Sequence, residues 1–192
     1  MAEEKYKKII EMHKRWLKNE PYSKRADFSN KNLCSADLSG ANLSYAIFTQ
    51  ANLENANLEQ ANVQGADFYG VNFFKAKIIH TNFSEANLHN TSFTDNLLHN
   101  ANFTKANLTE AKFINSKLYD IDFKYANLTA AQFNSVQAQN AYFYYACMRN
   151  IIMNHIDFSD CIFRSALVSG IFLSQVKIND QLITEFPDSL TK

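Results

Sequence analysis

A repeat of five residues occupies about three quarters of this chain. Every fifth position from Phe28 to Leu173 is Phe, Leu, Val, Ile, Met or Ala, without a change of phase. The position two residues earlier is small, and Ala fills 18 of those 30 sites. The residue between them is most often Asn or Asp, as in Ala41-Asn42-Leu43. A repeat of this length defines the fold of the chain.

A period of five excludes the two ordinary secondary structures. At about 100° per residue, five helical residues advance roughly 500°, so the apolar positions would spread around a helix instead of forming one stripe. In a flat strand, side chains alternate between faces, so an odd period would send the central residue alternately to the core and to water. The pattern instead predicts an inward, outward, inward step followed by two outward residues that turn the chain. The backbone must therefore coil.

The sizes of the central residues indicate how many sides each coil has. From Phe83 to Phe133 these residues alternate strictly between Phe and Leu. With four sides per coil, Phe would stack on Phe and Leu on Leu in every column, whereas three sides would mix the sizes in each column. A two-sided coil would satisfy the alternation as well.

The A(D/N)LXX pattern resembles the pentapeptide-repeat proteins, and the resemblance extends over about three quarters of the chain. It implies an all-β solenoid, a right-handed quadrilateral parallel β-helix with four pentapeptides per coil. Thirty repeats would make 30/4 = 7.5 coils, a rod about 36 Å long at roughly 4.8 Å per strand spacing. The core columns would then include the central residues Leu58, Phe83, Phe103, Phe123, Phe143 and Phe163.

Two end segments flank the predicted rod of residues 26–175. Residues 1–20 are expected to hold an amphipathic helix that caps the open end of the coil, because a terminal β-helix layer exposes apolar side chains and strand edges. Residues 176–192 are expected to form a short C-terminal cap or a dimerisation segment. The apolar positions that indicate the N-terminal helix are Tyr6, Ile9, Ile10, His13 and Leu17.

The outward Asn/Asp site becomes apolar towards the C-terminal end, and an outward apolar row needs covering. Residues 176–192 could fold back over it within the chain. A homodimer through the C-terminal end is the alternative, because isologous dimers are the commonest assembly, and the resemblance implies the same pairing. The residues expected to make the cap or dimer contact are Ile152, Phe172, Leu182, Ile183 and Phe186.

Four tyrosines gather on the exterior of the predicted rod. Tyr125 and Tyr145 would stack one coil apart, with Tyr142 and Tyr144 near them. Aromatic packing between strands explains such a column. Exposed tyrosines also favour protein contacts, so the same four residues form the candidate partner surface.

Charge and composition limit the binding partners and the cellular location that are expected for the chain. The chain holds 19 basic and 19 acidic residues. Residues 1–25 carry eight Lys/Arg and four Asp/Glu, whereas residues 26–175 carry nine and twelve. This net charge of 8 − 4 = +4 on the first segment is thin support for a nucleic-acid-binding arm, and no direct nucleic-acid binding is expected. The sequence has no apolar segment typical of a signal peptide or a membrane span, so the expected location is the cytoplasm, without membrane contact.

Nothing in the repeat favours catalysis. A rod filled with Phe, Leu and Ala leaves no interior pocket for a substrate. His80 and His99 would lie on one face in adjacent coils, but no third metal ligand stands at an evident spacing. Asn96 and Ser116 would share a buried column, where hydrogen bonding within the column is favoured over a ligand-binding notch. We expect no enzyme, no cofactor and no metal site.

Two functional hypotheses follow. The first is a non-catalytic scaffold that binds a protein partner along a rigid, flat-sided rod. The second comes from the resemblance, because some pentapeptide-repeat proteins mimic duplex DNA, bind type II topoisomerase such as gyrase, and protect it from quinolones or toxins. A mimic requires columns of outward carboxylates. Here twelve acidic residues share the rod with nine Lys/Arg, which favours the scaffold.

Overall fold

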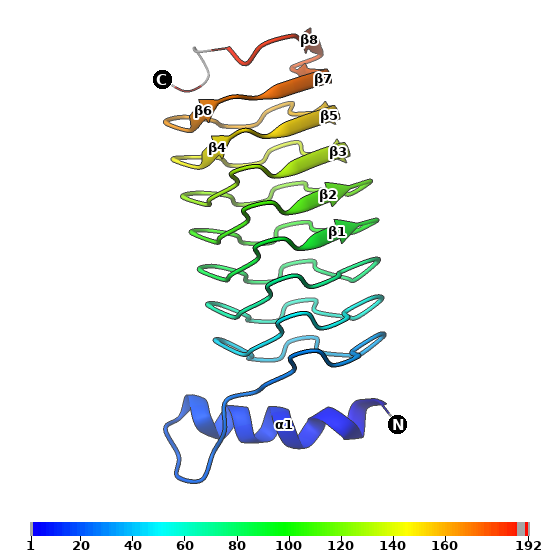
Figure 1. Cartoon of the computed structure of the whole chain (residues 1–192), viewed down its shortest axis with the longest axis vertical. Helices are drawn as coiled ribbons and strands as arrows, with labels where there is room; N and C mark the ends of the chain where they lie inside the picture. The colour runs from blue at the N-terminus through cyan, green and yellow to red at the C-terminus, as the bar shows by residue number, and fades with distance from the viewer. Residues whose placement is uncertain (1, 188–190, 192) are drawn as a thin grey trace.

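A stack of coils, closed at one end by a helix, makes up the protein (Figure 1). The structure is a computed structural model and describes residues 2–187 and 191. The chain climbs from helix α1 (Ala2–Leu17) through the coils to the short strand β8 (Gln181–Ile183). Residues 1, 188–190 and 192, the outermost parts of the two predicted end segments, lie outside the described residues.

Residues twenty apart in sequence pair in consecutive coils. Parallel bridges join Asn82 to Asn102 and Asn102 to Asp122, and the same spacing recurs along the rod. Four five-residue repeats therefore make one coil, which decides between the two-sided and four-sided alternatives. In Figure 1 the near strands run left to right while the chain climbs towards its C-terminal end, which is a right-handed coil. The predicted right-handed quadrilateral β-helix is confirmed.

Within the described chain, longer strands form only from Ser92 onward. Six of them build one sheet in the order β1-β2-β3-β5-β7-β8, and β4 pairs with β6. All neighbours are parallel except β7 and β8, whose antiparallel pairing ends the sheet. The bounds are β1 Ser92–Thr94, β2 Lys112–Ile114, β3 Gln132–Gln137, β4 Cys147–Arg149, β5 Ile152–Asp157, β6 Leu167–Ser169 and β7 Phe172–Ile178.

One repeat shows how the backbone of every side is satisfied. The Phe103 and Lys105 N–H groups donate to the carbonyls of Asp122 and Lys124 at 2.7 and 2.9 Å. Within the corner, the Ala106 N–H donates to the Phe103 carbonyl at 2.9 Å. Lys105 has a φ of 60°, the positive φ that the third residue of a type II turn requires.

Positive φ recurs at every fifth residue from Asn30 to Gln175, and only four of these residues are glycine. A side chain in this region costs about 1–2 kcal/mol. The repeated backbone hydrogen bonds between coils offset that cost at each corner.

The Asn or Asp between the two inward residues has a structural role. The Asn102 Oδ1 accepts the Thr104 N–H at 2.9 Å, an Asx turn that supports the start of the corner. The Asn102 amide also donates to Asn82 Oδ1 in the preceding coil at 3.2 Å. This residue type therefore stabilises both the turn and the stacking of coils.

Stacked aromatic rings fill the middle of the rod. Phe83 and Phe103 lie parallel with their ring centroids 4.9 Å apart, and so do Phe93 and Phe113 on the opposite side. The two columns meet edge to face, as Phe83 does with Phe93. Such pairs contribute about 0.5–1.5 kcal/mol each beyond area burial. The structure buries every residue assigned to the core columns: Leu58, Phe83, Phe103, Phe123, Phe143 and Phe163.

Helix α1 lies across the N-terminal end and contacts the first coils. The Tyr6 hydroxyl donates to the Asn32 carbonyl at 2.6 Å. His13 is fully buried, stacks on Trp16, and accepts the Ala26 N–H at Nδ1 over 3.0 Å. The helix thus satisfies backbone groups of the first coil, as a cap must.

The C-terminal end is closed only in part. Val176 of β7 is buried, and Phe186 packs edge-on against Phe163 with their ring centroids 4.8 Å apart. The outward row remains uncovered by the described residues, since Ile152 is 42% and Phe172 68% exposed. Residues 176–187 therefore cover part of the end of the core and leave the outward row exposed.

The buried histidine links stability to pH. Burial lowers the pKa of His13 from 6.5, and the positive charge of Arg25 lowers it further, while the backbone of Ser44 acts in the opposite direction. The folded protein thus favours neutral His13, whose Nδ1 must accept the Ala26 N–H. As the pH falls below about 6.5, His13 takes up a proton in the unfolded chain before it does so in the folded protein. The stabilisation that comes from burying neutral His13 is therefore complete above about pH 6.5 and is lost as the pH falls below that value.

A His13→Asn variant tests this linkage, because an amide oxygen can replace Nδ1 as the acceptor but does not titrate. We expect the variant to lose about 1–3 kcal/mol at neutral pH through poorer packing on Trp16. Its melting temperature should fall less than that of the wild type between about pH 7.5 and pH 5. An equal fall in both proteins would show that His13 does not carry the acid sensitivity.

Candidate functional site

The most distinctive exterior surface lies on the side of the rod whose central residues are Phe103, Phe123, Phe143 and Phe163. In its N-terminal half, Asn42, Asn62, Asn82 and Asn102 form a ladder of amide hydrogen bonds between coils. The same column continues as Asp122, Tyr142 and Ile162. The exterior of this side thus changes from amide to aromatic and apolar.

We call the C-terminal half of this side the tyrosine face. All three outward residues in the repeat of Phe143 are tyrosines, namely Tyr142, Tyr144 and Tyr145. Tyr125 lies one coil below Tyr145, and the two rings stack 5.1 Å apart at an interplanar angle of 6°. Both rings are 54% exposed, and Tyr142 is 37% exposed. The structure therefore brings together all four residues of the predicted partner surface.

Three cations border these tyrosines. Lys124 and Arg164 occupy the column of Tyr144, one coil on either side of it, and Lys105 occupies the column of Tyr125. This arrangement was not predicted from the sequence, although the twenty-residue spacing that places residues in one column could have indicated it. The face combines aromatic surface, hydroxyl groups and positive charge, which is suited to polar recognition of another macromolecule.

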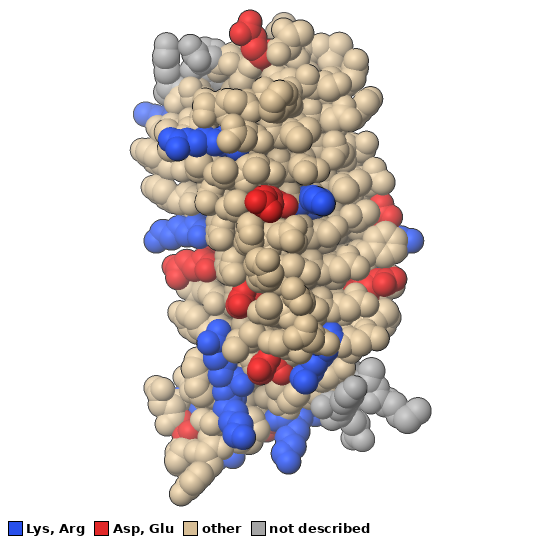
Figure 2. All heavy atoms as spheres, viewed as in Figure 1, with Lys and Arg blue, Asp and Glu red and all other residues tan. Residues whose placement is uncertain are grey.

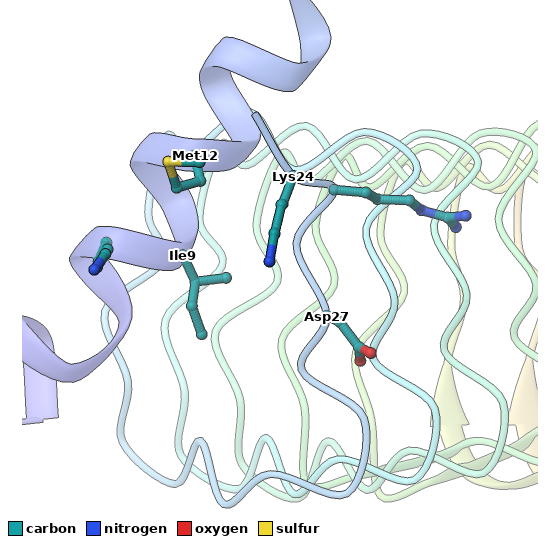
Figure 3. Close-up of a pocket in the computed structure, with 6 residues that line it drawn as sticks. Ile9, Met12, Lys24 and Asp27 are labelled. Carbon is teal, nitrogen blue, oxygen red and sulfur yellow. The ribbon is translucent and has the colours of Figure 1, made fainter. Parts of the chain in front are cut away.

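A groove with a volume of about 360 Å³ lies between helix α1 and the first coil (Figure 3). Ile9 and Met12 approach it from the helix, and Lys24 and Asp27 from the chain that enters the coil. Hydrogen bonds from the Ser29 hydroxyl and N–H lower the pKa of Asp27. This carboxylate is therefore a weak acid catalyst, and the groove offers it no base partner among its lining residues.

The C-terminal end carries an apolar row. Ile152 and Phe172 pair in register on adjacent strands β5 and β7, as the repeat predicts for residues one coil apart. Leu182 on β8 is 61% exposed. Ile183 and Phe186, the other residues assigned to this contact, are half-buried against the end of the core.

The remaining candidates have structural explanations. His80 and His99 are joined through their backbones, where the His80 N–H donates to the His99 carbonyl. Asn96 is buried and donates to the Phe73 and Ala76 carbonyls at 2.7 and 2.9 Å, so it belongs to the core.

Ser116 completes that buried column, because its hydroxyl accepts the Asn96 N–H at 3.1 Å. Burial raises the pKa of Cys161 to about 12, which keeps this thiol protonated at neutral pH. Within residues 2–187 and 191, no group of three His, Cys, Asp or Glu side chains could hold a metal ion.

Charges on the rod do not form a continuous acidic stripe. In no column of residues 26–175 do carboxylates stand in two consecutive coils. Figure 2 shows red and blue side chains interspersed among uncharged ones on the near face, with Lys and Arg gathered at the helix end. The exterior is therefore of mixed charge. The helix of the described chain is too short and too polar to cross a membrane.

These features define a class: a four-sided β-solenoid repeat protein with a filled core and an exposed aromatic face. The family comparisons agree. A model of the pentapeptide repeat region matches residues 46–123, and a model of pentapeptide repeats matches residues 24–55 and 116–154. The chain belongs to the pentapeptide-repeat family. No curated protein matches its sequence.

Solved structures show the same fold. Two trypsin-treated variants of QnrB1, a plasmid-mediated fluoroquinolone resistance protein, align with TM-scores of 0.60 at 19% and 20% identity. Each alignment covers 79% of this chain, and 83% and 81% of QnrB1 respectively. A pentapeptide repeat protein from Nostoc PCC 7120, alr5209, aligns at 23% identity over 56% of this chain and 83% of its own, with a TM-score of 0.47. The likeness to the two QnrB1 structures, at 19% and 20% identity, establishes the fold alone.

Proposed function

We propose that the protein is a non-catalytic scaffold that binds a protein partner through the tyrosine face. The observation that carries this proposal is the group of four outward tyrosines in two adjacent coils, with Tyr125 and Tyr145 more than half exposed. Their parallel rings are held by the backbone ladder beneath them. A partner therefore meets a preformed surface and little ordering cost.

The filled interior also supports a scaffold, because stacked side chains occupy the core of the rod. We also propose a cytoplasmic location, because the exposed Cys34 forms no disulfide and a free thiol is typical of a reducing compartment. Exposed tyrosine rings are frequent anchors of protein contacts, because they bury a large area with few rotatable bonds.

Quantitative pull-down from cells of the source organism tests the scaffold. A Tyr125→Ser/Tyr145→Ser variant should lose a protein that the wild type retains, while losing only about 1 kcal/mol of stability with the stacked pair. Tyr69→Ser is the matched control, since Tyr69 is an exposed tyrosine outside the tyrosine face. Identical protein sets for the double variant and the control would refute this use of the face.

We also propose a homodimer through the C-terminal end. The outward row of Ile152 and Phe172 stays exposed, and it continues a sheet that ends at β8. A second copy would cover the row by the same contact on both protomers, as a two-fold axis requires. The half-buried Leu173 and Ile183 at the end of the core extend the apolar area.

Sedimentation velocity at micromolar concentration tests the dimer. Phe172→Asp should give a monomer, because a charge would be buried in the contact. Leu97→Asp should remain dimeric, since Leu97 is an outward apolar residue in the middle of the rod and 43% exposed. A monomeric wild type, or the same behaviour in both variants, would contradict the proposal.

Interaction with a type II topoisomerase such as gyrase is the second candidate function. Its support is the fold shared with QnrB1, a fluoroquinolone resistance protein, over 79% of this chain. The mixed charge of the rod weighs against DNA mimicry, since a mimic needs successive carboxylates at the spacing of phosphates. The scaffold therefore remains the preferred function.

A gyrase supercoiling assay with and without ciprofloxacin separates the two candidates. We expect neither inhibition of supercoiling nor protection from the drug at micromolar protein, because the rod lacks an acidic column. Protection of gyrase from ciprofloxacin that depends on added protein would favour the topoisomerase function.

A further inference from the structure

The tyrosine face leaves its hydrogen-bonding groups unused. Within the described chain, the hydroxyls of Tyr125, Tyr142, Tyr144 and Tyr145 make no hydrogen bond to another residue. By contrast, the hydroxyl of Tyr119 on the neighbouring side donates to Gln137. Folding therefore does not use the four hydroxyls, and each can donate to an acceptor on a partner.

The positive charge beside these hydroxyls is also partly free. Lys124 pairs with Asp122 at 3.1 Å, and its Nζ lies 5.0 Å from the centroid of the Tyr142 ring. No carboxylate within residues 2–187 and 191 lies within 4.0 Å of a basic group of Lys105 or Arg164. The next acid in the Lys105 column is Glu85, one coil nearer the N-terminal end and therefore away from the tyrosines. Among residues 2–187 and 191, the tyrosine face thus presents two cations without a carboxylate partner, Lys105 and Arg164, and one paired cation, Lys124.

The arrangement of the tyrosine rings and the cations favours a protein segment over a single-stranded nucleic acid as the partner. A single-stranded nucleic acid would stack its bases on open ring faces. Tyr125 and Tyr145 instead stack on each other, so their facing surfaces are occupied, and Asp122 would lie beside the phosphates. Carboxylates of a protein segment need only the hydroxyl and cationic donors at the edges of this surface.

We propose that the tyrosine face binds an acidic segment of a partner protein, with carboxylates on both sides of an apolar side chain that packs on the tyrosines. This inference rests on the proposed scaffold function and adds the chemical class of the partner. Charge complementarity favours encounter with an acidic surface and opposes basic ones. The apolar side chain would supply the buried contact at the centre.

The spacing of the cations specifies the segment further. Lys124 and Arg164 are two coils apart in one column, about 10 Å at the strand spacing of a sheet. Carboxylates seven residues apart on a helix are separated by about 10.5 Å, and a residue three or four positions along lies between them on the same face. An acidic amphipathic helix laid along the rod axis therefore matches Lys124, Tyr144 and Arg164.

Selection from a displayed library of random peptides tests the inference without naming the partner in advance. Peptides enriched on the full-length wild type should be acidic, with an apolar residue between the acids. They should bind K105E/K124E/R164E at least about tenfold more weakly than the wild type. The matched control K75E/K112E/K117E has the same net charge but alters exposed lysines on other sides, and its affinity should stay within about twofold.

Enrichment of neutral or basic peptides, no enrichment, or equal losses in both triple variants would overturn the inference. So would a labelled thymidine oligonucleotide that binds more tightly than the selected peptides and fails to bind K105E/K124E/R164E. Failure of the acidic-partner inference can be distinguished from failure of the proposed scaffold function. If the Tyr125→Ser/Tyr145→Ser pull-down still loses a partner, only the acidity of the partner is wrong, and if it loses none, the scaffold function fails as well.

Discussion

The structure depends on backbone hydrogen bonds between residues of consecutive coils, made at the same offset on every side. Each corner places one residue at positive φ, which costs energy for any residue with a side chain. The corner is tolerated because its N–H is then aimed at a carbonyl in the next coil, as the Lys105 N–H is at Lys124. The residue at positive φ and the hydrogen bond between coils that offsets its cost recur together along the rod. Neither the corner nor the ladder would therefore persist without the other.

This regular ladder determines which parts of the rod are free to vary. The rod fills its interior with Phe, Leu and Ala from every side, and stacked rings leave no room for a substrate. Outward positions are less constrained, except where Asn or Asp supports a turn and the adjoining coil, as Asn102 does. Where that requirement is relaxed, as at Tyr142 and Phe172, the exterior becomes available for binding.

The repeat made the core residues predictable, because burial depends only on position within each group of five residues. It did not reveal why Asn and Asp recur, since the Asx turn and the amide ladder are properties of the folded corner. The N-terminal helix was predicted from its apolar spacing, but the acceptor role of His13 depends on where Ala26 enters the first coil. The grouping of Lys105, Lys124 and Arg164 around the tyrosines was not predicted, because it depends on the twenty-residue spacing between coils and not on neighbours in sequence.

A coiled rod with inward Phe and Leu could be predicted from the order of residues alone, because a five-residue period is incompatible with a straight helix or a flat strand. The sequence also identified the four tyrosines and the apolar C-terminal row as unusual outward residues. The folded coordinates were needed to establish that each coil has four sides, that Lys124 and Arg164 flank Tyr144, and that the described residues leave the outward row exposed. Local spacing governs which side chains face inward, whereas neighbours across coils depend on the twenty-residue register of the hydrogen-bond ladder.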